Sequence, residues 1–269
     1  MSIDTNYKIV RGIGVPAFKL YYHPKIINAE FIPKEGPILL CGNHLHVLNQ
    51  LPVICATKRV THWMAKKEYF DGKLGPFFKS TGAICVDRYG DANKSKEEAI
   101  NYLKKGSAVG IFPEGTRNIY QLSKIKVEKI NVEINNLNKL YQEGKIKEDE
   151  YKKLLCELKK ALEERKEKLD EAIKSIEKRG IQVIENDIVL PFKFGAVSMA
   201  QKTDALIVPF AVTGKYKFNS KDLMVRFGKP FKVGNDLEES NCELRDKVIT
   251  LVKENLKKRL QFRLKHVKN

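Results

Sequence analysis

The chain has 269 residues, of which 42% are hydrophobic, so it can bury a core and is not a disordered polymer. We expect one domain, or one domain that carries an insertion. Its formal charge of +17, from 50 Lys and Arg against 33 Asp and Glu, favours an anionic partner. Nucleic acid and anionic lipid surfaces both satisfy that charge.

Residues 1–24 mix bulky apolar side chains with lysine and arginine, as an amphipathic segment in a lipid interface does. An ordinary helix packed on the domain is the alternative, although Gly12, Gly14 and Pro16 count against a continuous helix. No secretory signal is recognisable in this segment. Residues 36–57 are uncharged, but polar side chains and prolines interrupt them, so no membrane span is expected.

From residue 36 onward, short apolar runs alternate with helical stretches, which is typical of an α/β domain. Strands are expected at residues 38–41, 61–64, 83–86, 108–112, 206–212 and 223–227. Helices are expected near residues 50–57, 67–79, 93–105, 195–202 and 239–263.

Residues 118–190 interrupt this alternation with a long charged segment whose apolar positions follow heptad spacing. The two heptad arms, 127–141 and 151–176, lie on either side of Gly144 and predict an inserted antiparallel, coiled-coil-like hairpin. This segment holds 16 Lys and Arg against 15 Asp and Glu, so +16 of the charge belongs to the rest of the chain. The hairpin either packs within its own chain or serves self-association or partner docking.

The five cysteines show no CxxC pair and no Cys/His ligand spacing, so neither a disulfide framework nor a metal site is predicted. Reduced intracellular thiols are the simpler interpretation.

Two stretches end expected strands with reactive side chains. The first, GNHLHVLNQLP at residues 42–52, puts His44 in a turn between a strand and a helix, where a rigid backbone meets free helix amides. Histidine in a turn is also common for structural reasons alone. The second, GAICVDR at residues 82–88, ends in Arg88, which can fork onto a phosphate or pair with a surface carboxylate.

Two later stretches complete the set. IFPEGTR at residues 111–117 packs an acid, a glycine, a hydroxyl and a guanidinium into four residues, a combination suited to binding phosphate oxygens. VPFAVTG at residues 208–214 is an apolar strand with an internal proline, Pro209. Proline is disfavoured in a central ladder, so this strand is expected at an edge, at a bulge or at a functional irregularity.

Taken in order, these four stretches resemble the blocks of the 1-acylglycerol-3-phosphate (lysophosphatidic acid) acyltransferase family, which has NHxxxxD, strand-Asp-Arg, FPEGTR and VPxxxxG blocks. The resemblance covers about residues 25–117 and 188–230 and leaves the hairpin out. It implies an α/β domain, built from residues 25–117 and 191–269, with a mixed central sheet flanked by helices. It also implies acyl transfer to the free hydroxyl of 1-acylglycerol-3-phosphate, which yields phosphatidic acid.

The resemblance implies His44 as the base that takes the proton of the acceptor hydroxyl. Residues implied at the acceptor phosphate are Arg88, Glu114, Gly115, Thr116 and Arg117, with Lys193 as a further basic candidate. The acyl thioester donor, acyl-CoA or acyl carrier protein, serves as co-substrate, and no other cofactor is implied. The implied location is peripheral, on the cytoplasmic face of the cell membrane, where the enzyme meets an anionic surface and its lysophospholipid acceptor.

One position departs from the family: the fifth residue after His44 is Asn49 where the family has aspartate. Asparagine and aspartate cap helices equally well. A carboxylate, however, orients the imidazole and stabilises the imidazolium, and in serine proteases the analogous Asp-to-Asn change lowers turnover roughly ten-thousand-fold. We therefore expect Asn49 to weaken catalysis.

Three alternatives stay open: an acyltransferase for another lysophospholipid, a non-catalytic lipid-binding or scaffold protein, and a basic nucleic-acid-binding protein. The last is the least favoured, because no recognised nucleic-acid motif and no aromatic-rich basic stretch is found. No nucleic-acid partner is therefore expected.

Overall fold

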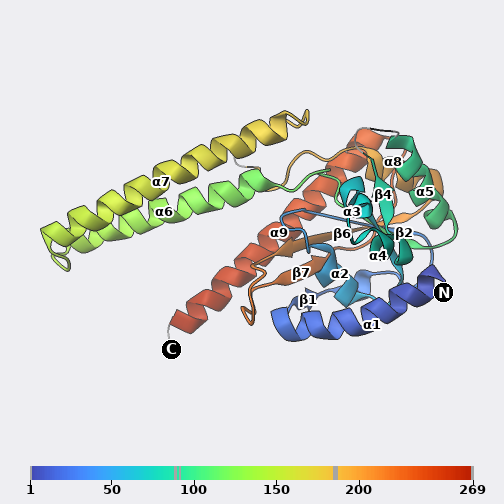
Figure 1. Cartoon of the computed structure of the whole chain (residues 1–269), viewed down its shortest axis with the longest axis horizontal. Coiled ribbons are helices and arrows are strands. Elements are labelled where there is room, and N and C mark those ends of the chain that lie inside the picture. The colour runs from blue at the N-terminus through green and yellow to red at the C-terminus, as the bar shows by residue number, and fades with distance from the viewer. Residues whose placement is uncertain (1, 88–89, 91, 184–186, 268–269) are drawn as a thin grey trace. The chain divides into compact units, whose positions relative to one another are not determined.

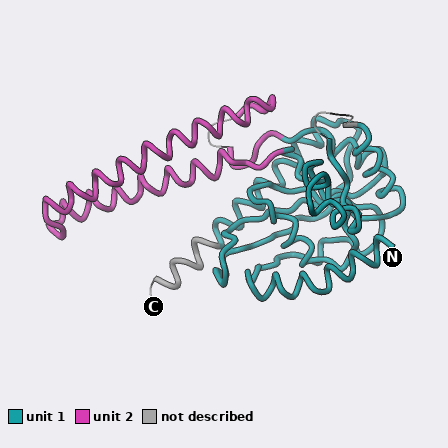
Figure 2. The backbone as a smooth tube through the Cα atoms, viewed as in Figure 1, with its two compact units in different colours: residues 1–115, 192–269 teal, residues 116–191 magenta. Residues whose placement is uncertain are grey.

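The computed structural model describes residues 2–87, 90, 92–183 and 187–267 (Figure 1). The chain forms two compact units, one made of residues 1–115 and 192–269 and the other of residues 116–191 (Figure 2). We call them unit 1 and unit 2 and describe each by itself.

Unit 1 is built on a sheet that contains seven strands within the described residues, in the order β1-β7-β6-β2-β5-β3-β4. The strands are β1 (Lys25–Ile27), β2 (Ile38–Gly42), β3 (Thr61–Lys66), β4 (Ile84–Val86), β5 (Ala108–Ile111), β6 (Leu206–Thr213) and β7 (Met224–Phe227). Every pairing is parallel except that of β6 with β7. The expected mixed α/β sheet is confirmed, and β1 is an addition, because three half-buried residues carry no clear pattern.

Helices of unit 1 cover both faces of this sheet (Figure 1). They are α1 (Ile3–Tyr22), α2 (Gln50–Ala56), α3 (Lys67–Asp71), α4 (Gly75–Ser80), α5 (Ala92–Lys104), α8 (Gly195–Thr203) and α9 (Leu237–Val267), with a 3-10 turn at η1 (Ala29–Phe31). All five residues of β2 are buried, as in a parallel strand covered on both faces. The expected helix at 67–79 is divided into α3 and α4, because Gly72 is extended and ends α3.

The N-terminal helix α1 corrects one expectation. It runs without interruption over 20 residues that include Gly12, Gly14 and Pro16. Its buried side chains Tyr7 and Phe18 pack it on the domain, and such packing outweighs weak intrinsic propensity. The helix therefore belongs to the folded domain, while part of its surface still presents apolar side chains to solvent.

The strand β6 shows which of the three expected settings Pro209 occupies. It is not an edge strand, because it pairs with β2 on one side and with β7 on the other. Pro209 is tolerated because β7 pairs only with residues 210–213 of β6 and the next contact on that side is the bridge between Ile207 and Phe231. The missing N–H of Pro209 falls in that interruption, where the Pro209 carbonyl still accepts the N–H of Gly228 at 2.8 Å.

Unit 2 contains the predicted helical hairpin, formed by α6 (Ile119–Gln142) and α7 (Glu148–Glu177), which pack against each other. At its tip, the rings of Tyr141 and Tyr151 stack with centroids 4.2 Å apart. The hydroxyl of Tyr151 also donates to Asn138 Oδ1 at 3.0 Å. At the other end, Tyr120, Ile176, Ile181 and Leu190 form a small apolar core. Self-association or partner docking through this hairpin stays a prediction.

Within the described part of the chain, no helix combines the length and the apolar character needed to cross a membrane.

Candidate active site

Asn43 fixes the turn that follows β2. Its side chain is buried, and its carboxamide forms two hydrogen bonds with the backbone of Val212 in β6. Asn43 Nδ2 donates to the Val212 carbonyl at 3.0 Å, and Asn43 Oδ1 accepts the Val212 N–H at 2.8 Å. These bonds continue the pairing of β2 with β6 beyond the end of β2, and so they anchor the residue immediately before His44.

His44 contacts the turn that follows β5 in two ways. Its ring stacks on Phe112, with centroids 4.1 Å apart and an interplanar angle of 10°. Its backbone N–H donates to Glu114 Oε1 at 2.6 Å. Because β2 and β5 are neighbouring parallel strands, the turns at their carboxyl ends meet at one edge of the sheet, the usual position of ligand sites in such folds.

The turn after β5 closes tightly at Gly115. This glycine has a φ of +65°, a left-handed conformation that favours glycine, and its N–H donates to the Phe112 carbonyl at 3.0 Å. The side chain of Lys193 lies against it, since a Cβ at Gly115 would stand 3.0 Å from Lys193 Cε. Lys193 N–H also donates to the Pro113 carbonyl at 3.0 Å, so a lysine lies beside the turn that contacts His44.

Asn49 is the residue that precedes α2, as expected for an N-cap, but its side chain turns back instead of capping the helix. It is 1% exposed, and its Oδ1 accepts the N–H of Leu45 at 3.1 Å and also the N–H of His46. The backbone N–H of Asn49 donates to the His46 carbonyl at 3.1 Å. Asn49 therefore shapes the turn that carries His44.

An aspartate would act differently at position 49. One of its oxygens could accept the same two backbone N–H groups, the other would be a second acceptor, and the carboxylate as a whole would bring a negative charge into the turn. Asparagine offers an N–H₂ donor in place of that second oxygen. Where a carboxylate oxygen faces an imidazole nitrogen, the oxygen keeps a proton on that nitrogen by accepting its hydrogen bond. An N–H₂ group in the same place cannot do so, because it is itself a donor.

The other predicted phosphate residues lie in unit 2 or outside the described residues. Arg88 lies outside the described residues, although Asp87 before it forms an ion pair with Lys67 at 2.8 Å. Thr116 and Arg117 begin unit 2, where Thr116 Oγ1 accepts a hydrogen bond from Arg179 Nη1 at 3.3 Å. Unit 1 thus brings together His44, Glu114, Gly115 and Lys193 from the predicted set.

Two aromatic residues near the site carried no sequence-based role. Phe112 supports the His44 ring, and Tyr216 stacks on His46 with centroids 4.2 Å apart. His46 Nδ1 accepts the N–H of Leu48 at 3.2 Å, which puts the proton of the neutral ring on Nε2. Burial raises the pKa of the Tyr216 hydroxyl well above its usual range. The signal available in the sequence was that Phe112 begins the FPEGTR block and that Tyr216 follows the VPxxxxG block by two residues.

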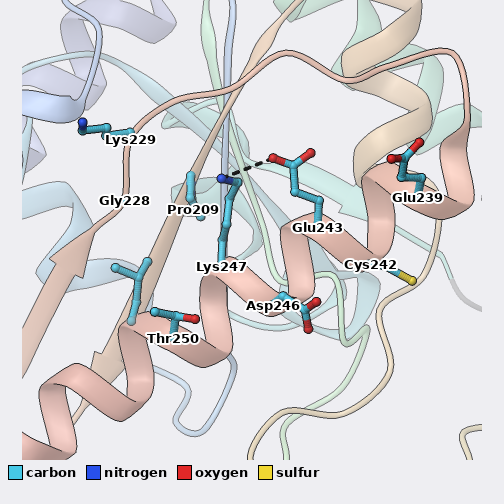
Figure 3. A pocket seen from close by; sticks show the side chains of 10 residues that line it. Pro209, Gly228, Lys229, Glu239, Cys242, Glu243, Asp246, Lys247 and Thr250 are labelled. Carbon is cyan, nitrogen blue, oxygen red and sulfur yellow. Dashed lines mark ion pairs between the residues drawn. The ribbon is translucent and has the colours of Figure 1, made fainter.

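Unit 1 also contains a groove of about 560 Å³ (Figure 3). Its lining includes Pro209, Gly228 and charged residues of α9, among which Glu243 and Lys247 form an ion pair at 3.2 Å. It is lined by neither His44 nor the turn after β5, so the groove is separate from the candidate site.

Comparisons with known proteins agree with this architecture. A crystal structure of the 1-acyl-sn-glycerophosphate (LPA) acyltransferase PlsC from Thermotoga maritima superposes with a TM-score of 0.55 at 17% identity, covering 92% of this chain and 78% of that one. At that identity the likeness concerns the fold.

Two curated relatives match part of the sequence. A 1-acyl-sn-glycerol-3-phosphate acyltransferase of Bacillus subtilis (strain 168) is 35% identical over 95 residues, which are 35% of this chain and 48% of that protein. An enzyme of the same name from Borreliella burgdorferi is 30% identical over 99 residues, 35% of this chain and 38% of that protein. Each match thus spans less than half of the relative's length.

The family match is broader than these pairwise ones. The model of the Acyltransferase family covers residues 23–213, from the strand β1 to the end of β6, and so includes both turns that meet at His44. On this match, which takes in well over half of the sequence, the chain belongs to the acyltransferase family.

Proposed function

We propose that this chain transfers a fatty acyl group from acyl-CoA or acyl carrier protein to the free hydroxyl of 1-acylglycerol-3-phosphate, which yields phosphatidic acid. The observation that carries the proposal is the pair of contacts between His44 and the turn after β5, through Phe112 and Glu114. These contacts join His44 to a turn against which Lys193 lies, and a lysine suits an anionic head group. The names of the two curated relatives support the same substrate.

The reaction needs one proton carrier and no covalent acyl-enzyme. His44 takes the proton of the acceptor hydroxyl while the oxygen attacks the thioester carbonyl. When the tetrahedral intermediate collapses, the C–S bond breaks and the imidazolium returns the proton to the leaving thiolate. The products are an ester and a free thiol.

Basic and hydroxyl side chains of the motif blocks would bind the acceptor phosphate. Lys193 is the described cation beside the turn after β5, and Arg88, Thr116 and Arg117 are further candidates from the motif blocks. Arginine matches phosphate oxygens in a forked geometry, while lysine acts as a point charge. Gly115 would allow close approach of the backbone to the ligand.

The acceptor is an amphiphile, so the enzyme must reach it at a bilayer surface. We infer peripheral binding to the cytoplasmic face of the cell membrane, supported by the +16 charge outside the hairpin segment. The helix α1 adds exposed apolar side chains, among them Ile13 at 73% and Leu20 at 75% exposure.

Thiol release from acyl-CoA in the presence of lysophosphatidic acid tests the proposal. Replacing Asn49 with Asp should raise kcat by at least about tenfold, because a carboxylate orients the imidazole and stabilises its charged form. His44→Ala should abolish transfer in either background. Asn101→Asp, which adds the same charge at an exposed site on α5, serves as the matched control. Equal activity of this chain and its Asn49→Asp variant would contradict the paired roles of residues 44 and 49.

Two other functions give different results in the same assay. A panel of lysophospholipids identifies an acyltransferase for another head group by the acceptor that gives the highest kcat/KM. A non-catalytic lipid-binding or scaffold protein would bind lysolipid tightly without thiol release, and it would do so after the Asn49→Asp change as well. The observation that favours this second role is Asn49, because it stands where the family has aspartate.

A further inference from the structure

Glu114 is the buried acid of the turn after β5. Its side chain is 0% exposed, and its Oε1 accepts the backbone N–H of His44 at 2.6 Å. This distance is short for an N–H···O bond, as charge-assisted bonds are. The contact joins residues 70 positions apart, one from each of the two turns that build the site.

The strand pairing brings together the two turns that this contact joins. In the parallel ladder of β2 with β5, Cys41 lies opposite Ile111. His44 and Glu114 each lie three residues beyond this pair, in the turn that follows its strand. The contact therefore links the two turns through a side chain where the backbone pairing has ended.

A phosphate-binding role fits Glu114 poorly. Its carboxylate is covered by protein, whereas a group that binds a phosphate must be accessible to the ligand and donate a hydrogen bond. A carboxylate is also negative, and it repels a phosphate monoester. The cation beside this turn, Lys193, suits that purpose better.

We propose that Glu114 is a positioning residue, which holds the His44 backbone so that the imidazole stays on the face of Phe112 and directed at the acceptor hydroxyl. This inference rests on the proposed acyl transfer by His44. It gives Glu114 a role different from phosphate binding, because it acts on the rate of the chemical step and not on the affinity for the acceptor.

Steady-state kinetics separate the two roles, with the Asn49→Asp variant as the background. Glu114→Ala removes the acceptor of the His44 N–H and should lower kcat by about a hundredfold, the size of loss that a misplacement of about 1 Å causes. The KM for lysophosphatidic acid should change by less than about threefold. Glu114→Gln keeps an acceptor oxygen and should retain about tenfold more kcat than Glu114→Ala. The exposed Glu239→Gln on α9 is the matched control and should behave as the background does.

A spectroscopic measurement tests the contact without any turnover. The chain has five histidines, so selective ¹⁵N-histidine labelling gives five backbone amide signals, and His44→Ala identifies the one from His44. A short bond to a carboxylate moves the amide proton downfield. We expect that signal to move upfield in Glu114→Gln and farther upfield in Glu114→Ala.

Several outcomes overturn the inference. A rise of tenfold or so in acceptor KM in Glu114→Gln, with kcat retained, means that Glu114 contacts the acceptor directly. An unchanged His44 amide signal in both variants removes the contact itself. If Glu114→Ala does not fold, Glu114→Gln decides by the same two measurements. Absence of thiol release in the Asn49→Asp background overturns the proposed function, and the positioning role with it. If only the positioning role of Glu114 is wrong, thiol release in that background remains.

Discussion

Several buried polar side chains near His44 act on the backbone of the chain. Asn43 binds the backbone of Val212, Asn49 binds the N–H groups of its own turn, and Glu114 binds the N–H of His44. Buried polar groups stabilise a structure when both partners are satisfied, and they cost free energy when one is removed. These residues therefore set the backbone conformation of the site, and this backbone determines where the His44 ring lies.

Asn43→Ala should lower the free energy of unfolding by about 2 to 4 kcal/mol, because it leaves the N–H and the carbonyl of Val212 unsatisfied in the interior. Urea denaturation followed by circular dichroism measures the change. Asn101→Ala, at an exposed position of α5, is the matched control and should change stability by less than about 0.5 kcal/mol. Equal stability of the two variants would show that the Asn43 bonds contribute nothing net.

A second buried side chain makes stability depend on pH. Burial lowers the pKa of His62, an effect opposed by its hydrogen bond to the Gly82 carbonyl and by the charge of Asp4. The carbonyl can only accept, so Nδ1 carries the proton of that 2.8 Å bond. The folded chain therefore binds a proton less readily at this site than the unfolded chain does.

As the pH falls below about 6.5, the ordinary pKa of histidine, the unfolded chain takes up a proton that folded His62 resists. We expect this histidine to lower the free energy of unfolding by at most about 1.4 kcal/mol per pH unit in that range. His62→Gln should flatten that part of the profile, measured by urea denaturation between pH 5 and pH 8 or so. Parallel profiles for the two proteins would contradict the direction of the shift.

At the scale of elements, glycines in different surroundings have opposite expected effects. Gly12 lies inside α1 with open space around it, whereas Gly110 in β5 faces the indole of Trp63. A Cβ at Gly110 would stand 2.5 Å from that ring, closer than side-chain atoms pack. Because Gly110 has no side chain, it makes room for Trp63. The Trp63 ring stacks on Phe112, which in turn stacks on His44.

Gly12→Ala should raise the free energy of unfolding by about 0.5 to 1 kcal/mol, because alanine loses less backbone entropy in a helix. Gly110→Ala should lower it by about 1 to 3 kcal/mol through overpacking against Trp63. Thermal unfolding of both variants, followed by tryptophan fluorescence from the single Trp63, gives the two shifts side by side. A gain in stability for Gly110→Ala would be incompatible with the packing of that ring.

Over the whole molecule, charge is distributed unevenly along the chain. The segment 118–190 is almost neutral, and the remaining residues carry +16. An anionic surface would therefore attract the residues outside this segment far more strongly than the segment itself. Lipid and nucleic acid both supply such a surface, and the exposed apolar side chains of α1 favour lipid.

Vesicle flotation tests this preference. The chain should bind vesicles that contain anionic phospholipid and dissociate as salt rises, because screening weakens attraction between exposed charges. Ile13→Asp in α1 should weaken binding by about tenfold or more, which corresponds to the free energy of burying one aliphatic side chain. Val132→Asp, exposed on α6, is the matched control and should leave binding unchanged. Tighter binding to an oligonucleotide at the same salt would instead favour the nucleic-acid alternative.

Much of the architecture followed from the order of residues alone. The apolar runs predicted six strands, and the heptad spacing predicted the α6 and α7 hairpin, because both patterns depend on neighbours close in sequence. The motif blocks identified the family and singled out His44. The short strand β1 and the break between α3 and α4 were missed, since neither has a distinctive local pattern.

The sequence by itself determined the class of fold, the family and the turn that carries His44. Only the tertiary structure decided that α1 is continuous, that β6 is a central strand, and that the acid of the FPEGTR block binds the backbone of His44. The physical reason is the distance along the chain. The partners of Asn43 and Glu114 are 169 and 70 residues away, and only the register of the sheet brings such groups within hydrogen-bonding distance.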